Sequence, residues 1–162
     1  MLQLLCLAIL VPCAGIVGCR PEEIELPFET IEQEEAAGEI WDTEEPGLMI
    51  IATPEDVAQI DDLFTKDAQV QLREMDFGTY FAIASFLGRQ GGSHEGIETE
   101  RVVRRGDAVS VYVHVGRPGM FEIVTSPYHL VKVRKEGNWG QRIDFKLCME
   151  GEYITSLAHF IP

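Results

Sequence analysis

A strict alternation of apolar and polar residues is the feature that most limits how this chain can fold. Between residues 108 and 116, four valines occupy every second position, and serine, tyrosine and histidine stand between them. Successive side chains of a β-strand point to opposite faces, so this pattern predicts a strand with one buried face. The turn Gly106-Asp107 joins it to a second β-prone run over 97–105.

Similar runs fill most of the rest of the chain. The expected strands cover 48–52, 80–87, 97–105, 108–116, 128–135, 141–149 and 153–160. One helix is expected over 54–64, where Thr53 and Pro54 form a helix start. From Val57 to Phe64 the apolar residues then recur at helical spacing. The sequence predicts an α+β, mainly β fold: an antiparallel β-sandwich-like or half-barrel domain of about six or seven strands with one N-terminal helix.

If the strands from residue 80 onward run alternately up and down, their connections separate into two groups. Loops 88–96, 117–127 and 150–152 would share one end of the domain, and turns 106–107 and 136–140 the other. Long loops on a rigid sheet often carry binding sites. The first end therefore holds the candidate partner-binding residues: Arg89, Gly91, Gly92, Ser93, His94, Arg117, Pro118, Met120 and Phe121.

Two alternatives stay open for these loops. The glycines from Gly88 to Gly92 permit positive φ and a close approach of the backbone, which suits either a plain hairpin loop or a loop presented to a partner. Phe121 would equally suit covering the end of the sheet. Arginine and aromatic residues are common interface anchors, which favours the partner-binding interpretation for Arg117.

The first 18 residues are predicted to be a lipoprotein signal peptide. Residues 1–19 carry no charged side chain, and Ile16-Val17-Gly18-Cys19 resembles a bacterial lipobox, in which small residues precede the cysteine that receives lipid. Spanning a bilayer needs about 20 apolar residues, more than this run supplies. Lipidated Cys19 is expected to anchor the protein at the cell envelope, on the outer face of a bacterial membrane. A plain cleaved signal and a retained anchor are the alternatives.

The net charge of −14 is unevenly distributed along the chain. Residues 20–48 contain eleven acidic residues and one basic residue. Repelling charges and three prolines predict an acidic, extended tether over 19–47, followed by a β-rich domain over 48–162. An acidic chain is also a poor partner for nucleic acid. In an alternative reading, apolar residues of the tether dock on the domain or on a partner: Phe28, Ile31 and Trp41.

Cys148 is the one cysteine expected in the mature domain, because two others lie in the predicted signal peptide and Cys19 carries lipid. An intramolecular disulfide is therefore not expected. Its neighbours Phe145, Leu147 and Met149 predict a buried structural thiol.

The polar residues give weak signals for catalysis and for metal binding. The four histidines form no pair at helical spacing, and no Cys-x-x-Cys is present, so we expect no metal and no cofactor. Ser93 and His94 are adjacent in sequence and would point apart, which makes them a poor nucleophile–base pair. No Gly-x-Ser-x-Gly motif is present. His129 should share a buried face with Val131 and Val133, with its polar atoms satisfied. We expect no catalytic residue.

Four segments follow one another in an order that is found in a known family. They are Asp76-Phe77, the apolar run 80–87, the loop Gly88-Arg-Gln-Gly-Gly92 and the stretch Thr125-Ser-Pro-Tyr-His-Leu-Val-Lys-Val133. This order resembles the PrcB-like C-terminal domain family, bacterial and often lipid-anchored proteins named for a component that stabilises a surface protease complex. The resemblance covers roughly residues 48–135. It departs from the family after the double glycine, where members tend to carry a tyrosine.

The resemblance implies a non-enzymatic, protein-binding role. The first hypothesis is a membrane-anchored lipoprotein whose domain binds and stabilises an exported protease or other envelope protein. The second is a protease inhibitor that presents loops 88–96 and 117–127 to a peptidase cleft. A structural envelope module without a stable partner is the third.

Overall fold

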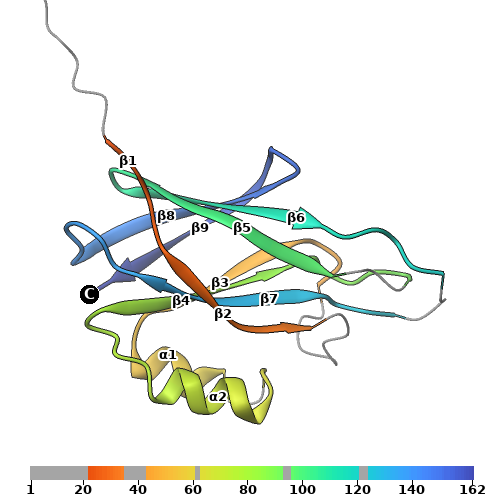
Figure 1. The fold of residues 1–162 in the computed structure, drawn as a ribbon, viewed down its shortest axis with the longest axis horizontal. Coiled ribbons are helices and arrows are strands. Elements are labelled where there is room, and N and C mark those ends of the chain that lie inside the picture. Colours follow the sequence, from red (N-terminus) through yellow and green to blue (C-terminus); the bar gives the residue numbers. More distant parts are fainter. Residues whose placement is uncertain (1–21, 35–42, 61–62, 93–95, 121–123) are drawn as a thin grey trace, which may run out of the picture.

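Two β-sheets and two helices make up the computed structural model, which describes residues 22–34, 43–60, 63–92, 96–120 and 124–162 (Figure 1). The helices are α1 (Pro54–Gln59) and α2 (Lys66–Arg73). The nine strands of the described residues are β1 (Glu23–Glu25), β2 (Phe28–Glu34), β3 (Gly47–Ile51), β4 (Tyr80–Phe86), β5 (Ile97–Arg105), β6 (Ala108–Val115), β7 (Tyr128–Arg134), β8 (Gln141–Met149) and β9 (Glu152–Ile161). The expected mainly β, sandwich-like fold is confirmed.

The strands divide between the two sheets in a way that preserves the predicted directions. One sheet has the order β1-β5-β6-β8-β9 and the other the order β2-β7-β4-β3. Neighbours pair antiparallel except β6 and β8, which run parallel. They run parallel because β7, which lies between them in the sequence, crosses to the other sheet. From β4 onward strand directions therefore alternate along the chain, although successive strands are not always neighbours.

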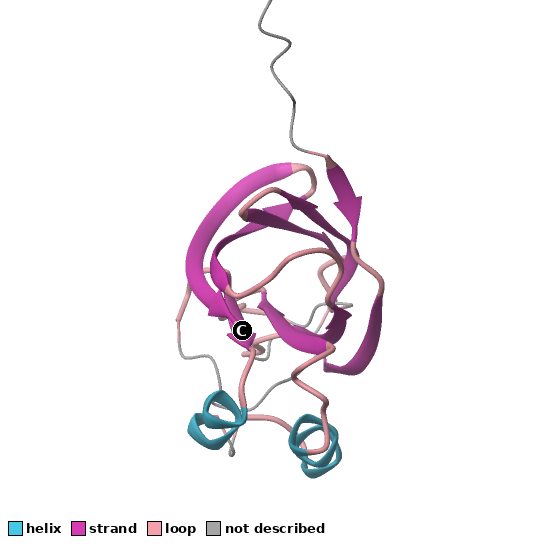
Figure 2. Cartoon of the chain, turned by 90° about the vertical axis from the view of Figure 1, so that its left-hand side faces the viewer, coloured by secondary structure: helices cyan, strands magenta, loops and turns pink. Residues whose placement is uncertain are grey.

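Two apolar layers hold these elements together. The larger layer lies between the sheets and includes Phe81, Ile83 and Phe145. The second lies between the four-stranded sheet and the helices and includes Ala82 and Ala84. Both helices lie on the same side of the sandwich (Figure 2). Strand β4 is therefore covered on both faces, as its unbroken apolar run predicts.

The spacer prediction for residues 19–47 is wrong for the part that the structure describes. Strand β1 pairs with β5 and β2 pairs with β7, which accounts for the two strands beyond the predicted six or seven. The chain changes sheets at Leu26, which is 1% exposed and whose N–H donates to Val102 O at 2.8 Å. Phe28 packs on the core between the sheets and Ile31 on the core under the helices. Trp41 lies outside the described residues.

The spacer prediction is wrong because it treated proline as a residue that prevents regular structure. Pro27 follows Leu26 at the point where the chain leaves one sheet and enters the other, and it needs no N–H there. It divides two strands rather than preventing structure. The folded domain consequently begins before residue 48, within the segment that the charge pattern assigned to a tether.

The helical region also differs from the prediction, which placed one helix over 54–64. Helix α1 starts where expected, because Thr53 Oγ1 accepts a hydrogen bond from Asp56 N at 3.2 Å and Asp56 Oδ2 accepts one from Thr53 N at 3.0 Å. It ends at Gln59, and α2 forms beyond it. Helix α2 was not expected because its sequence is mostly polar, and only Ala68 and Leu72 form its buried face.

Candidate functional site

The two long loops lie together at one end of the sandwich, as the strand directions predict (Figure 1). Gln90 N donates to Thr125 O at 2.8 Å, and Thr125 N donates to Gln90 O at 3.1 Å. Thr125 Oγ1 also donates to Gly92 O at 2.9 Å. At the opposite end, Arg104 donates to the carbonyls of Gly106 and Glu136 and so joins the two short turns.

The hairpin between β8 and β9 belongs to the same end as the long loops. Its Glu150 carboxylate accepts a hydrogen bond from Val115 N at 2.9 Å and lies 2.9 Å from His114 Nδ1. The Val115 N–H and the neighbouring His114 hold the pKa of Glu150 below its usual range. The hairpin is thereby fastened to the end of β6. We use the term loop end for the described residues of loops 88–96 and 117–127 together with this hairpin.

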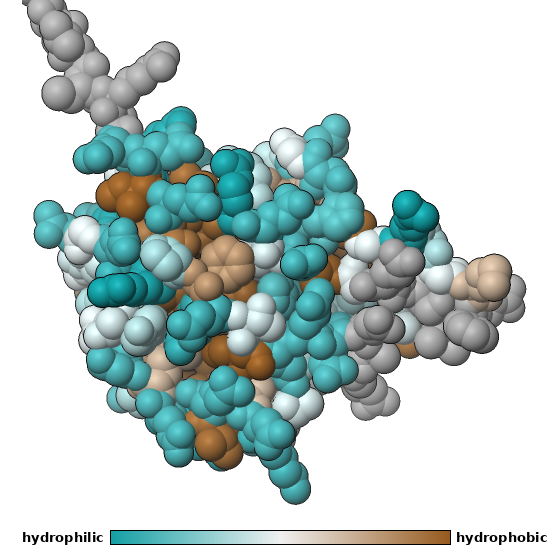
Figure 3. Space-filling view, in the orientation of Figure 1, coloured by the Kyte–Doolittle hydropathy of each residue, from teal (hydrophilic) through white to brown (hydrophobic). Residues whose placement is uncertain are grey.

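Large apolar side chains are concentrated at the loop end. Six are exposed among the described residues: Val70, Met120, Val124, Tyr153, Ile154 and Phe160. Met120 and Val124 belong to loop 117–127, and Tyr153 and Ile154 follow the hairpin turn, so four of the six lie at this end. In Figure 3 an apolar side chain projects at the right-hand side, where Figure 1 places the segment after β6.

Two of the predicted site residues, Arg89 and Gly91, border one open hollow at the loop end. It has a volume of about 440 Å³ and is lined by Glu44, Arg89, Gln90, Gly91 and Val124. Arg89 N donates to Thr43 O at 2.9 Å, which fixes the backbone of this loop. Gly88 has a φ of +79°, and a Cβ atom there would lie 2.7 Å from Glu44 O, so only glycine fits.

The remaining predicted residues are only partly brought together. Arg117, Pro118 and Met120 are exposed on the second loop, and Gly92 is bound to Thr125. Three predicted residues lie outside the described residues: Ser93, His94 and Phe121. The sequence did not single out Val124, Tyr153 or Ile154. Apolar residues next to the tight turn Glu150-Gly151 are the signal that would have found the last two.

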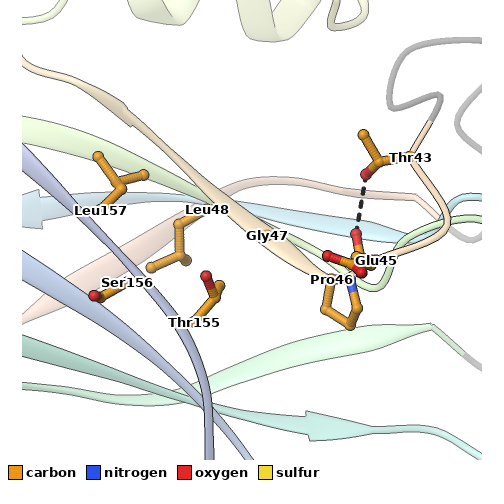
Figure 4. A pocket seen from close by; sticks show the side chains of 8 residues that line it. All are labelled: Thr43, Glu45, Pro46, Gly47, Leu48, Thr155, Ser156 and Leu157. Carbon is orange, nitrogen blue, oxygen red and sulfur yellow. Dashed lines mark hydrogen bonds between the residues drawn. The ribbon is translucent and has the colours of Figure 1, made fainter.

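A groove separates the two sheets along the side where β3 and β9 form their edges. It has a volume of about 250 Å³ and is lined by Thr43, Glu45, Pro46, Gly47, Leu48, Thr155, Ser156 and Leu157. Leu48 lies in the groove across from Thr155 and Ser156 (Figure 4). Thr43 Oγ1 donates to Glu45 O at 3.0 Å and holds the groove's outer rim. The groove borders the loop end, since Thr43 also binds Arg89.

The buried histidine has a structural role, as the alternation predicts. His129 Nδ1 accepts a hydrogen bond from Thr99 N at 2.7 Å, and Nε2 lies 2.9 Å from Thr30 Oγ1. Nε2 therefore carries the proton and donates it to Thr30. Burial lowers the pKa of His129 to about 4, so the ring is neutral at pH 7. Ser85, its cross-strand neighbour, is fully buried, where a substrate would not reach it.

The prediction of a buried thiol at Cys148 is wrong. Phe145 and Leu147 are fully buried, but Cys148 is partly exposed. The alternation along β8 turns it to the opposite face, beside Lys146. Partial burial raises the pKa of the thiol.

Within the described ranges, no group of three or more His, Cys, Asp or Glu side chains is placed to hold a metal ion. Neither described helix has the length and apolar character needed to cross a membrane. No protein-family model, curated protein or solved structure matches the chain.

Proposed function

We propose that this chain is a non-enzymatic, membrane-anchored lipoprotein whose β-rich domain binds and stabilises an exported protease or other cell-envelope protein. The observation that carries the proposal is the concentration of exposed apolar side chains at the loop end. The anchor rests on the apolar leader and on Cys19, and the stabilising role rests on the resemblance to the PrcB-like family.

A protein partner suits the loop end better than a small molecule does. Met120 is 97% exposed, and Tyr153 is 61% exposed, so both project from the surface. Small-molecule sites are enclosed hollows, whereas protein interfaces bury projecting methionine, aromatic and arginine side chains. Arg89 and Arg117 belong to the same loops and supply polar groups at the rim of such an interface.

One observation favours protease inhibition as a second candidate function. The Gln90–Thr125 bridge and the bond from Thr125 to Gly92 join the two long loops into one projecting unit. Loops fixed in this way lose little conformational freedom when they enter a cleft, which favours tight binding. The same surface would then silence a peptidase rather than stabilise it.

Affinity capture of the full chain from its native membranes, followed by mass spectrometry, tests the proposal. We compare the parent chain with Met120→Ser/Tyr153→Ser and with the control Val70→Ser, which removes an exposed apolar side chain from α2. A stoichiometric envelope protein should accompany the parent and the control. Its recovery should fall about tenfold with the loop-end variant, as expected when interface anchors are lost.

The captured complex also separates the two candidate functions. A captured protease that remains active supports stabilisation, and one that is silenced supports inhibition. Equal recovery of the same protein with all three chains would reject the loop end as the binding surface. Recovery of the chain alone would reject a stable partner and leave a structural module.

A further inference from the structure

The four edge strands of the described sheets differ in how they are protected against pairing with another chain. Exposed edges are normally blocked by charged residues, by proline or by short length. Strands β1 and β2 carry five glutamates between them, and β3 has only five residues. Strand β9 is ten residues long, and its stretch Thr155–Ile161 contains no Asp, Glu, Lys, Arg or Pro. It is therefore the described edge strand least protected by charge, proline or short length, although a bulge lies at Ile154.

We propose that β9 pairs antiparallel with β9 of a second copy of this chain, about a two-fold axis at Leu157. Strand β9 pairs only with β8 among the described strands, so no described strand is hydrogen-bonded to its other edge, which faces β3 across the groove described above. A two-fold axis perpendicular to the sheet would join the two five-stranded sheets into one continuous sheet. This surface adjoins the loop end, with which it shares Ile154, and Tyr153 Oη donates to Ser156 Oγ at 3.3 Å. The inference does not depend on the proposed function.

The order of side chains along β9 selects the register. Phe160 is 54% exposed and Ile154 is 38% exposed, and the small residues Ser156 and Ala158 lie between them on the solvent face. Centring the pair on Leu157 sets Ile154 of one copy, the extra residue of a bulge in β9, opposite Phe160 of the other. The same register sets Ser156 opposite Ala158. Apolar side chains then meet across the strands, which stabilises a sheet.

The neighbouring registers fit less well. Centring on Ser156 would set Phe160 opposite the charged Glu152. Centring on Ala158 would set Ile154 opposite Pro162, which has no N–H to pair. The sequence of β9 therefore favours one register over its two neighbours.

The charge around β9 also permits self-association. A chain of net charge −14 repels its own copies unless the contact surface is neutral. The stretch Thr155–Ile161 has no formally charged side chain apart from the titratable His159. On the adjacent strand β8, Lys146 Nζ lies 3.7 Å from Asp144 Oδ2, so these two charges offset each other. Asp56 Oδ2 of α1 lies 3.4 Å from His159 Nε2, so a second copy meets this carboxylate beside an imidazole that contacts it.

Disulfide trapping of the full chain in native membranes tests the register. Two differently tagged chains, both carrying Cys148→Ser, are co-expressed, one with Ser156→Cys and the other with Ala158→Cys. Both positions are exposed, so the substitutions should leave the fold intact. Opposite residues in an antiparallel pair have Cα atoms about 4.5–5.5 Å apart, within the range that a disulfide spans. Either variant expressed alone sets its cysteines about 8 Å apart, which is beyond that range.

Mild oxidation should therefore give a mixed-tag dimer at a yield about tenfold above either variant alone, because only the mixed pair lies within the distance that a disulfide spans.

A second measurement introduces charged residues at the same two positions and uses the detergent-solubilised full chain. Ser156→Glu/Ala158→Glu should give monomers by light scattering, and Ser156→Glu/Ala158→Lys should give dimers, with circular dichroism confirming that both fold. Monomers for the parent and for both variants, or a disulfide to a different protein, would overturn self-pairing. Faster trapping of one variant alone would overturn the register.

Discussion

At the scale of single residues, His129 makes the stability of the domain depend on pH. Its Nδ1 accepts from Thr99 N and its Nε2 donates to Thr30, so a second proton would displace the Thr99 bond. The folded-state pKa is lowered by burial to about 4, whereas an unfolded histidine has a pKa of about 6.5. As pH falls between these values, the unfolded chain binds the proton first, and the free energy of unfolding decreases.

The expected loss is measurable by urea denaturation. Between pH 7 and pH 4.5, the free energy of unfolding should fall for the parent chain by about 2–3 kcal/mol more than for His129→Gln, which cannot titrate. The comparison with the variant removes the contribution of carboxylates that titrate in the same range. Equal losses in the two proteins would mean that His129 is not buried in the neutral form.

Arg104 is a second residue whose removal should weaken the fold. It is 7% exposed, and it donates to the carbonyls of Gly106, Glu136 and Asn138. Its guanidinium lies 4.0 Å from the centre of the Trp139 ring. Since Arg104→Gln leaves several carbonyls without a donor, it should lower the free energy of unfolding by about 3 kcal/mol. Chemical denaturation at pH 7 measures this loss.

The next residue supplies a matched control. Arg105 is exposed and forms an ion pair with Glu23 at the surface. Arg105→Gln should change the free energy of unfolding by less than about 1 kcal/mol, because exposed ion pairs contribute little. Similar effects of the two substitutions would contradict the assignment of Arg104 as the link between the two short turns.

At the scale of elements, β1 and β2 are part of the folded domain, because they pair with β5 and β7. Leu26 between them is buried in the layer that lies between the sheets. Leu26→Ala should therefore lower the free energy of unfolding by about 3 kcal/mol, as truncation of a buried leucine usually does. Val70→Ala, at an exposed position of α2, should change it by less than about 0.5 kcal/mol. A negligible effect at Leu26 in guanidinium denaturation would restore the spacer interpretation.

Local patterns in the sequence predict elements well where one residue type controls the outcome. Thr53 places the start of α1, and the alternation of valines places β6. Pairing between distant segments is not encoded in this local way. The glutamates of β2 led to the prediction of a solvated segment. The strand that pairs with β2 is β7, which lies about a hundred residues away in the sequence, so the local pattern does not show the pairing. The loop end was predictable from strand direction, but Tyr153 became a candidate only through its exposure in the structure.

At the scale of the whole molecule, the two sheets depend on a segment that the charge pattern assigns to a tether. Removing residues before 48 deletes β1 and β2 and with them one edge strand from each sheet. It exposes the apolar residues that Leu26 covers, and it turns β5 and β7 into new edges. The free energy of unfolding of a small domain is only a few kcal/mol, so exposing this apolar surface should prevent the shortened chain from folding.

Two fragments test this dependence. Residues 22–162 should fold and unfold in one cooperative thermal transition, because they contain both complete sheets. Residues 48–162, the domain that composition alone delimits, should lack that transition in circular dichroism and should bind a hydrophobic dye through exposed core. If the shorter fragment instead melted cooperatively at the same temperature, β1 and β2 would be accessory strands. The acidic segment would then regain the role of a tether that rests on an already complete domain.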